Sequence, residues 1–152
     1  MDRNILNRLD LSHYGLMKAQ VIELDESIRE AQDELTELNK YNISVSPVIT
    51  GMPKGNEKKD KIADFVIRLE KDRQRLNNRL SEMTAERAGM MYRLYLIRSA
   101  VNKIPDKQLR DVIIRHYLDG ESIIEIAESY YISANGIYKK INRFFQRGKR
   151  NP

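Results

Sequence analysis

The sequence predicts an all-α protein in which an antiparallel coiled-coil hairpin of two long helices precedes a small helical domain. Three observations lead to this fold class. Charged residues make up 32% and aromatic residues 7% of the 152 residues, a balance typical of long solvated helices. Apolar residues recur at heptad spacing in two long segments. Beyond Pro105 this pattern shortens into three brief helical segments.

The first long helix is predicted from His13 to Tyr41. Residues 1–12 are expected to form a short helical turn before it, with Ser12 as the N-cap of the long helix. The apolar residues of the long helix are spaced alternately by three and four positions, which places them on one seam. This seam consists of Val21, Leu24, Ile28, Ala31, Leu35 and Leu38.

Residues 42–60, "NISVSPVITGMPKGNEKKD", are predicted to be a loop because Pro, Gly and Ser interrupt the helical pattern. The loop is longer than most helix–helix connections. Gly51 and Gly55 lack the following Lys-Ser/Thr of a phosphate-binding loop, so no nucleotide site is predicted.

The second long helix is predicted from Lys61 to Asn102. Two arginines, Arg73 and Arg87, interrupt its seam and mark either a fixed register or an exposed stretch; we favour the first. The acidic first helix is expected to lie against the basic second helix. The surplus length, 86–102, then needs another apolar surface, from a second copy or from the C-terminal domain. The seam consists of Ile62, Val66, Leu69, Arg73, Leu76, Leu80, Met83, Arg87, Met90, Leu94, Ile97 and Val101.

Ile104-Pro105 is predicted to end the second helix, because a residue before proline is disfavoured in the α region. We therefore divide the chain into a helical hairpin or coiled-coil region, 1–104, and a C-terminal domain, 105–152. In the C-terminal domain Gly120 is expected to close the first helix.

The next helix of the C-terminal domain is expected to begin with a capping box of Ser122 and Glu125. Ile132 is expected to anchor the following short turn, and Ser133 to cap the last helix. Tyr130, Tyr131 and Tyr138 are expected either to stack on bases or to pack on the surface or in the core, and Tyr131 in particular is a candidate to fill the core of this turn.

Positive charge is concentrated in the last helix, since residues 133–152 hold six basic and no acidic side chains. One face of this helix is apolar, with Ile137, Ile141 and Phe144, and the opposite face carries amides and cations. Asn and Gln can pair with adenine, Lys can reach guanine, and peripheral Arg and Lys can neutralise phosphates. The predicted DNA-binding residues are Ser133, Asn135, Tyr138, Lys139, Lys140, Asn142, Arg143, Gln146, Arg147, Lys149 and Arg150.

The segment "LRDVIIRHYLDGESIIEIAESYYISANGIYKKINRF" resembles the region 4 helix-turn-helix of bacterial sigma factors. Many members of that family have glycine where this chain has Tyr131. The layout of the whole chain also resembles small sigma-like regulators of phages and prophages in Gram-positive bacteria. The matching residues are Tyr117, Leu118, Gly120, Ser122, Glu125, Ile126, Ala127, Ile132, Ser133 and Ile137.

The resemblance implies sequence-specific binding of double-stranded DNA and transcription regulation of phage genes. An activator or accessory factor is expected rather than a stand-alone sigma factor, because no core-promoter domain is evident. RNA polymerase and a second copy of the chain, joined through the long helices, are the expected protein partners. Two alternatives stay open: a DNA-packaging oligomer similar to a terminase small subunit, and a coiled-coil adaptor.

Catalysis, metal binding and cofactors are not expected. The sequence has no cysteine, and His13 and His116 are isolated from one another, whereas a metal site needs a cluster of ligands. No apolar run approaches the ~18 residues of a membrane span, and no signal-peptide core is evident. We therefore expect a cytoplasmic protein of a bacterial host, without a membrane partner.

Overall fold

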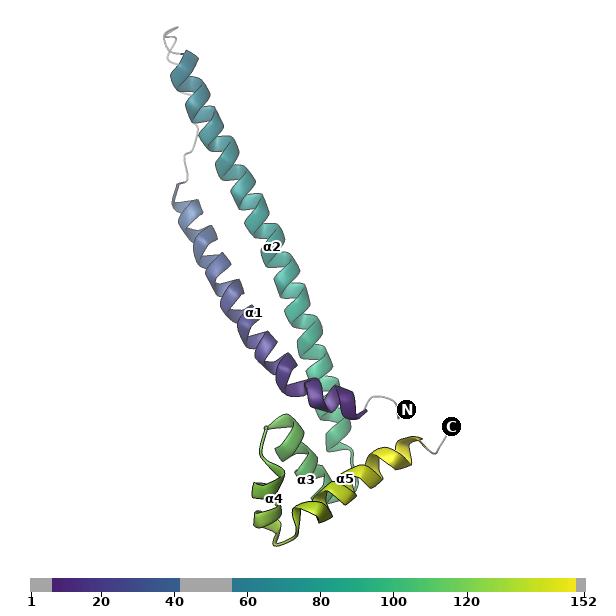
Figure 1. Ribbon diagram of the computed structural model, residues 1–152. Coiled ribbons are helices and arrows are strands. Elements are labelled where there is room, and N and C mark those ends of the chain that lie inside the picture. The colour runs from purple at the N-terminus through teal and green to yellow at the C-terminus, as the bar shows by residue number, and fades with distance from the viewer. Residues whose placement is uncertain (1–6, 42–55, 150–152) are drawn as a thin grey trace. The chain divides into compact units, whose positions relative to one another are not determined.

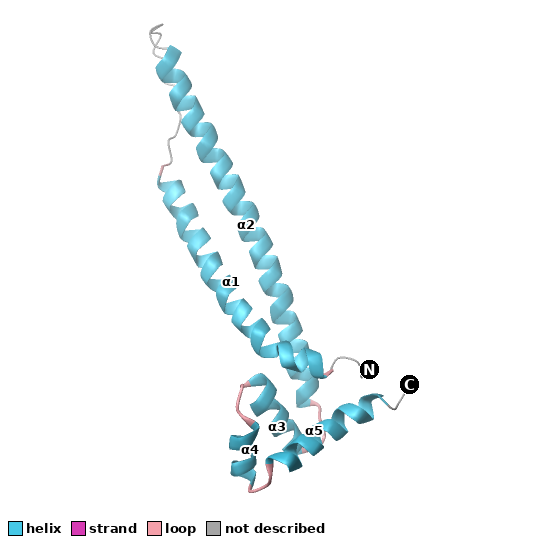
Figure 2. Cartoon of the chain, in the orientation of Figure 1, coloured by secondary structure: helices cyan, strands magenta, loops and turns pink. Residues whose placement is uncertain are grey.

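The computed structural model describes residues 7–41 and 56–149, and these ranges contain helices and no strand (Figures 1 and 2). The chain forms two compact units, one of Glu23–Arg87 and the other of Met1–Ile22 with Ala88–Pro152. No helix within the described ranges contains a stretch apolar and long enough to cross a membrane.

Two long helices, α1 (Arg8–Lys40) and α2 (Asn56–Asn102), pack antiparallel and confirm the coarse prediction (Figure 1). The helix α1 begins earlier than predicted. Ser12 is therefore not a cap, and its hydroxyl donates instead to the Arg8 carbonyl oxygen at 2.7 Å. The carbonyl of the Asn7 side chain accepts from the Asp10 N–H at 2.7 Å and caps the helix. The loop was predicted over 42–60, but residues 56–60 belong to α2. Residues 42–55 lie outside the described part of the chain.

Within the unit Glu23–Arg87, the predicted seam forms an apolar core. Its buried members are Ala31, Leu76 and Met83, and its partly buried members are Leu24, Ile28, Leu35, Leu38 and Leu80. The predicted seam does not extend to Ile62, whose side chain is 57% exposed.

The two seam arginines of the same unit both contact α1. Arg87 forms an ion pair with Asp25. Arg73 donates to the Leu38 carbonyl oxygen at 3.3 Å, near the C-terminus of α1. Each contact links one residue of α2 to one particular residue of α1. This favours a role for both arginines in fixing the register of the two helices.

The other unit has one larger core, to which α1, α2 and the C-terminal helices all contribute. The apolar seam at the surplus end of α2 is therefore covered within the same chain, by the start of α1 and by the C-terminal helices. This core includes residues on both sides of Pro105, and the domain boundary at residue 104 stays a prediction. From the long helices it contains Leu11, Tyr14, Met17, Val21, Leu94, Ile97 and Val101.

The C-terminal helices are α3 (Lys107–Ile113), the π-helix η1 (Ile114–Leu118), α4 (Ile123–Tyr130) and α5 (Ala134–Lys149). The carboxylate of Asp106 caps α3 by accepting from the N–H groups of Gln108 and Leu109. Gly120 has a φ of 78°, a left-handed conformation that glycine adopts without a steric penalty. The capping box of Ser122 and Glu125 at the start of α4 is confirmed.

The turn between α4 and α5 differs from the prediction. Tyr131 does not fill its core: its side chain is 96% exposed, and its φ of 55° is left-handed. Ile132 is 40% exposed and is not a buried anchor. The N–H of Tyr131 bonds back to α4, so the backbone rather than an apolar side chain closes the helix.

Replacing Tyr131 by glycine is expected to stabilise the protein by about 1 kcal/mol, because a left-handed conformation is strained for residues with a Cβ. The side chain is almost fully exposed and has little packing to lose. Chemical denaturation measures the change in the free energy of unfolding. Tyr131→Ala is the matched control, since it removes the ring but keeps the Cβ. Equal stability of the glycine and alanine variants would contradict the explanation by strain.

Candidate nucleic-acid interface

The helix α5 has one buried and one exposed side. Ile137 and Ile141 are each 1% exposed and belong to the larger core, and Phe144 and Phe145 pack against it. Ser133 caps the helix as predicted, because its hydroxyl oxygen accepts from the Gly136 N–H at 3.1 Å. The cap and the buried isoleucines fix which side chains of α5 face outward.

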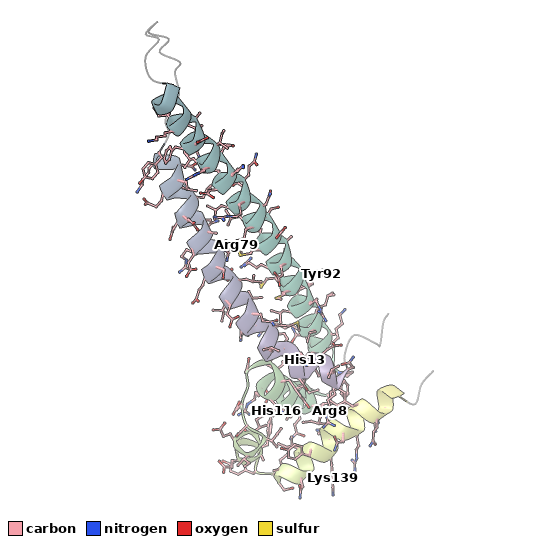
Figure 3. The ribbon with its side chains drawn as sticks, turned by 45° about the horizontal axis from the view of Figure 1, so that its top comes forward. Arg8, His13, Arg79, Tyr92, His116 and Lys139 are labelled. Atoms are coloured by element: carbon pink, nitrogen blue, oxygen red, sulfur yellow. The ribbon has the colours of Figure 1, made fainter. Side chains whose placement is uncertain are left out.

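The outward side of α5 carries amide, phenol and cationic groups. Lys139 extends away from the other C-terminal helices (Figure 3). Tyr138 is 47% exposed. Because residues 133–152 include no acidic residue, no carboxylate of α5 neutralises these cations. The predicted DNA-binding residues that are exposed are Ser133, Asn135, Tyr138, Lys139, Arg143, Gln146 and Arg147.

Two predicted DNA-binding residues contact other parts of the protein. The ammonium group of Lys140 lies 3.2 Å from the Asp106 carboxylate and donates to the Gln108 side chain at 2.6 Å. Asn142 is half-buried, and its Oδ1 accepts a hydrogen bond from Arg8. Lys149 is the last residue of α5, without a described side chain, and Arg150 lies outside the described part of the chain.

Arg8 is a member of this surface that the sequence did not indicate. Its Nη2 donates to Asn142 Oδ1 at 2.8 Å, and its guanidinium carbon lies 5.7 Å from the centre of the Phe145 ring. The first turn of α1 therefore contacts α5. The two partners are 134 positions apart in the sequence, which explains why no local pattern could reveal the contact.

A polar cluster joins the helices that brace α5. Arg115 of η1 donates to both carboxylate oxygens of Glu121, and its Nη1 donates to the Ser129 hydroxyl at 2.8 Å. The Tyr130 hydroxyl donates to the Asp111 carboxylate, so this tyrosine packs on protein. The cluster thus connects α3 and η1 to both ends of α4, next to the turn that leads into α5.

Two carboxylates around these helices, Glu121 and Asp106, have pKa values shifted in favour of their charged forms. The hydrogen bond from Arg115 holds the pKa of Glu121 below its ordinary value. The pKa of Asp106 is lowered chiefly by the hydrogen bond from the Leu109 N–H, with a contribution from Lys140. The pKa of Tyr130 is raised, first because its hydroxyl donates to Asp111 and then because it is partly buried.

Replacing Glu121 by glutamine is expected to weaken the acid dependence of folding. A carboxylate with a lowered folded-state pKa contributes stability above its unfolded-state pKa, about 4.3 for Glu, and loses it as the pH falls. The variant should therefore unfold more easily than the native chain at neutral pH, and the difference should shrink below about pH 4. Urea denaturation across this range measures it. Glu128→Gln, at an exposed site on α4, is the control. A difference that does not change with pH would contradict the prediction.

Comparison of the chain with protein-family models, curated proteins and solved structures gives no match. The resemblance to region 4 of sigma factors therefore depends on the motif residues alone. Several of these have defined structural roles here: Gly120 is left-handed, Ser122 and Glu125 form a capping box, and Ile126 and Ile137 are buried.

Proposed function

We propose that the protein binds double-stranded DNA sequence-specifically and regulates transcription, with α4 and α5 as a helix-turn-helix. The observation that carries the proposal is the two-sided character of α5. Ile137 and Ile141 hold the helix on its core, and the exposed side chains described on the outward side are amide, phenol and cationic groups. A helix of this kind fits the major groove, where such groups reach base edges and phosphates.

The outward residues fall into two roles in this proposal. Asn135, Lys139 and Gln146 read base edges, since amides and ammonium groups match the donors and acceptors there. Arg143 and Arg147 neutralise phosphates, together with the predicted contacts of Lys149 and Arg150. The helix α4 braces α5 through Ile126 and Ala127, which belong to the same core.

The region 4-like character and the regulation of phage genes rest on the resemblance of the motif. The caps, the left-handed Gly120 and the buried Ile126 and Ile137 support it, because these residues have the structural roles that the pattern needs, whereas Ile132 is exposed. Tyr131 departs from the pattern in residue type, but its left-handed backbone is the conformation that glycine commonly provides.

RNA polymerase or a second copy of the chain is the proposed protein partner of the long helices. On α2, Met91, Tyr92 and Tyr95 are 43%, 61% and 65% exposed. Tyr92 is labelled in Figure 3, and tyrosine is enriched among the residues that contribute most to protein interfaces. Sedimentation equilibrium of the purified protein gives the number of copies. A ring of many copies would favour the DNA-packaging alternative.

A selection of bound fragments from a random DNA library, with the purified full chain, tests the proposed function. We expect one enriched motif and an affinity that falls linearly, on logarithmic axes, with salt concentration. Retention of DNA without an enriched motif would contradict base reading. Absence of any DNA retention at low salt would instead favour the coiled-coil adaptor.

A further inference from the structure

We propose that Arg8 determines the base preference of α5 by donating a hydrogen bond to Asn142 Oδ1, so that this amide favours guanine over adenine. This inference rests on the proposed DNA-binding function. Asn142 lies one turn beyond Lys139, which faces outward on the same helix. Its Oδ1 accepts a hydrogen bond from Arg8 Nη2 at 2.8 Å.

The hydrogen bond changes what the amide of Asn142 can recognise. A free asparagine pairs with adenine by accepting from the adenine amino group and donating to N7, so it needs both amide atoms. In this chain the amide oxygen already accepts from a charged donor, a stronger type of hydrogen bond than a neutral one. One of the two lone pairs of the amide oxygen is thereby used, and the positive guanidinium beside it disfavours a second donor at that oxygen.

Guanine is the base whose major-groove edge matches a surface of donors. It presents two acceptors, N7 and O6, whereas adenine presents one acceptor and one donor. The guanidinium of Arg8 has five N–H donors and no acceptor, so the contact with Asn142 leaves further donors beside the amide. With a charged donor on Oδ1, the Asn142 amide therefore favours the two acceptors of guanine over the amino group of adenine.

Three features of the structure fix the position of Arg8. The side chain of Asn7 caps the first turn of α1 by accepting from the Asp10 N–H, which fixes where the helix begins. Leu11, one turn from Arg8, is 0% exposed and anchors that turn in the core. The Phe145 ring lies beneath the guanidinium, and a cation over an aromatic face is attracted to it. The contact is thus formed before DNA binds.

Selection from a random DNA library tests the inference, with the native chain, Arg8→Ala, Asn142→Ala and Arg8→Ala/Asn142→Ala. The position of the DNA motif that loses its base preference in Asn142→Ala is the position that Asn142 reads. We expect guanine there for the native chain. Arg8→Ala frees Oδ1, and the ratio of guanine to adenine affinity should fall by about tenfold, the size of one good base contact. Arg93→Ala removes an equal charge at an exposed site on α2 and should leave the ratio unchanged.

The double variant shows whether Arg8 affects base preference through Asn142 or only through its positive charge. If Arg8 acts through Asn142, removing Arg8 has no further effect on base preference when Asn142 is already alanine. A native motif with adenine at this position would overturn the inference, as would an Arg8→Ala motif identical to the native one. Either result would leave the proposed DNA binding intact, whereas a native chain that enriches no motif would overturn both. Thermal unfolding of each variant shows whether it is folded.

Discussion

Replacing Ile126 by alanine is expected to lower the free energy of unfolding by about 3 kcal/mol, within the range for isoleucine truncated in a packed core. Ile126 is 0% exposed and lies on α4, in the core that also contains Ile113 and Ile137. The lost methyl groups leave a cavity that neighbouring side chains can only partly fill. The loss is a large part of the 5–15 kcal/mol that stabilises a typical protein.

Ile124→Ala provides a matched control for this experiment. Ile124 lies two residues away on the same helix and is 65% exposed, so its truncation should change stability by no more than about 0.5 kcal/mol. Urea denaturation followed by far-UV circular dichroism measures both variants. Equal losses would mean that α4 does not pack in the described orientation. Because α4 braces α5, Ile126→Ala should also weaken DNA binding, whereas Ile124→Ala should not.

The elements with local signals in the sequence were predicted well. Ser122 and Glu125 form the expected capping box because both partners lie within one helical turn. Ala31, Leu76 and Met83 lie in the expected seam because heptad spacing places them on one face. Gly120 is left-handed as expected after a helix, where few other residues fit.

Features that depend on distant partners were not predictable in this way. Arg8 meets Asn142 only because α1 and α5 share one core. Lys140 was predicted on the DNA-binding face, and nothing in its neighbours indicates that Asp106 and Gln108 engage its ammonium group. The start of α1 was placed too late because Asn7, rather than Ser12, supplies the cap.

The turn between α4 and α5 shows a second reason why part of the structure could not be predicted from the sequence. Tyr131 was a candidate for the core of this turn, with base stacking and surface packing as the alternatives. In the structure its backbone is left-handed and its side chain is 96% exposed. The pattern of apolar residues around the turn therefore did not determine the environment of this residue.

Alanine substitution of Lys139 is expected to weaken specific DNA binding by about tenfold, while the same change at Lys140 leaves sequence discrimination intact. Lys139 is exposed on the outward side of α5. A lysine that contacts a base edge contributes discrimination of about 1–3 kcal/mol against the wrong base. Lys140 is directed to Asp106 and Gln108, so its loss should instead destabilise the fold by no more than about 1 kcal/mol, as expected for a partly exposed ion pair.

The two lysines form a matched pair, because each substitution removes one positive charge from adjacent positions of one helix. Both variants should therefore lose similar affinity for random DNA, and each should reduce the salt dependence by about one phosphate contact at most. The ratio of specific to random affinity, measured by fluorescence anisotropy with the selected motif and a shuffled one, isolates base reading. This ratio should fall for Lys139→Ala and stay unchanged for Lys140→Ala. Equal ratios in the two variants would mean that the outward side of α5 does not read bases through Lys139.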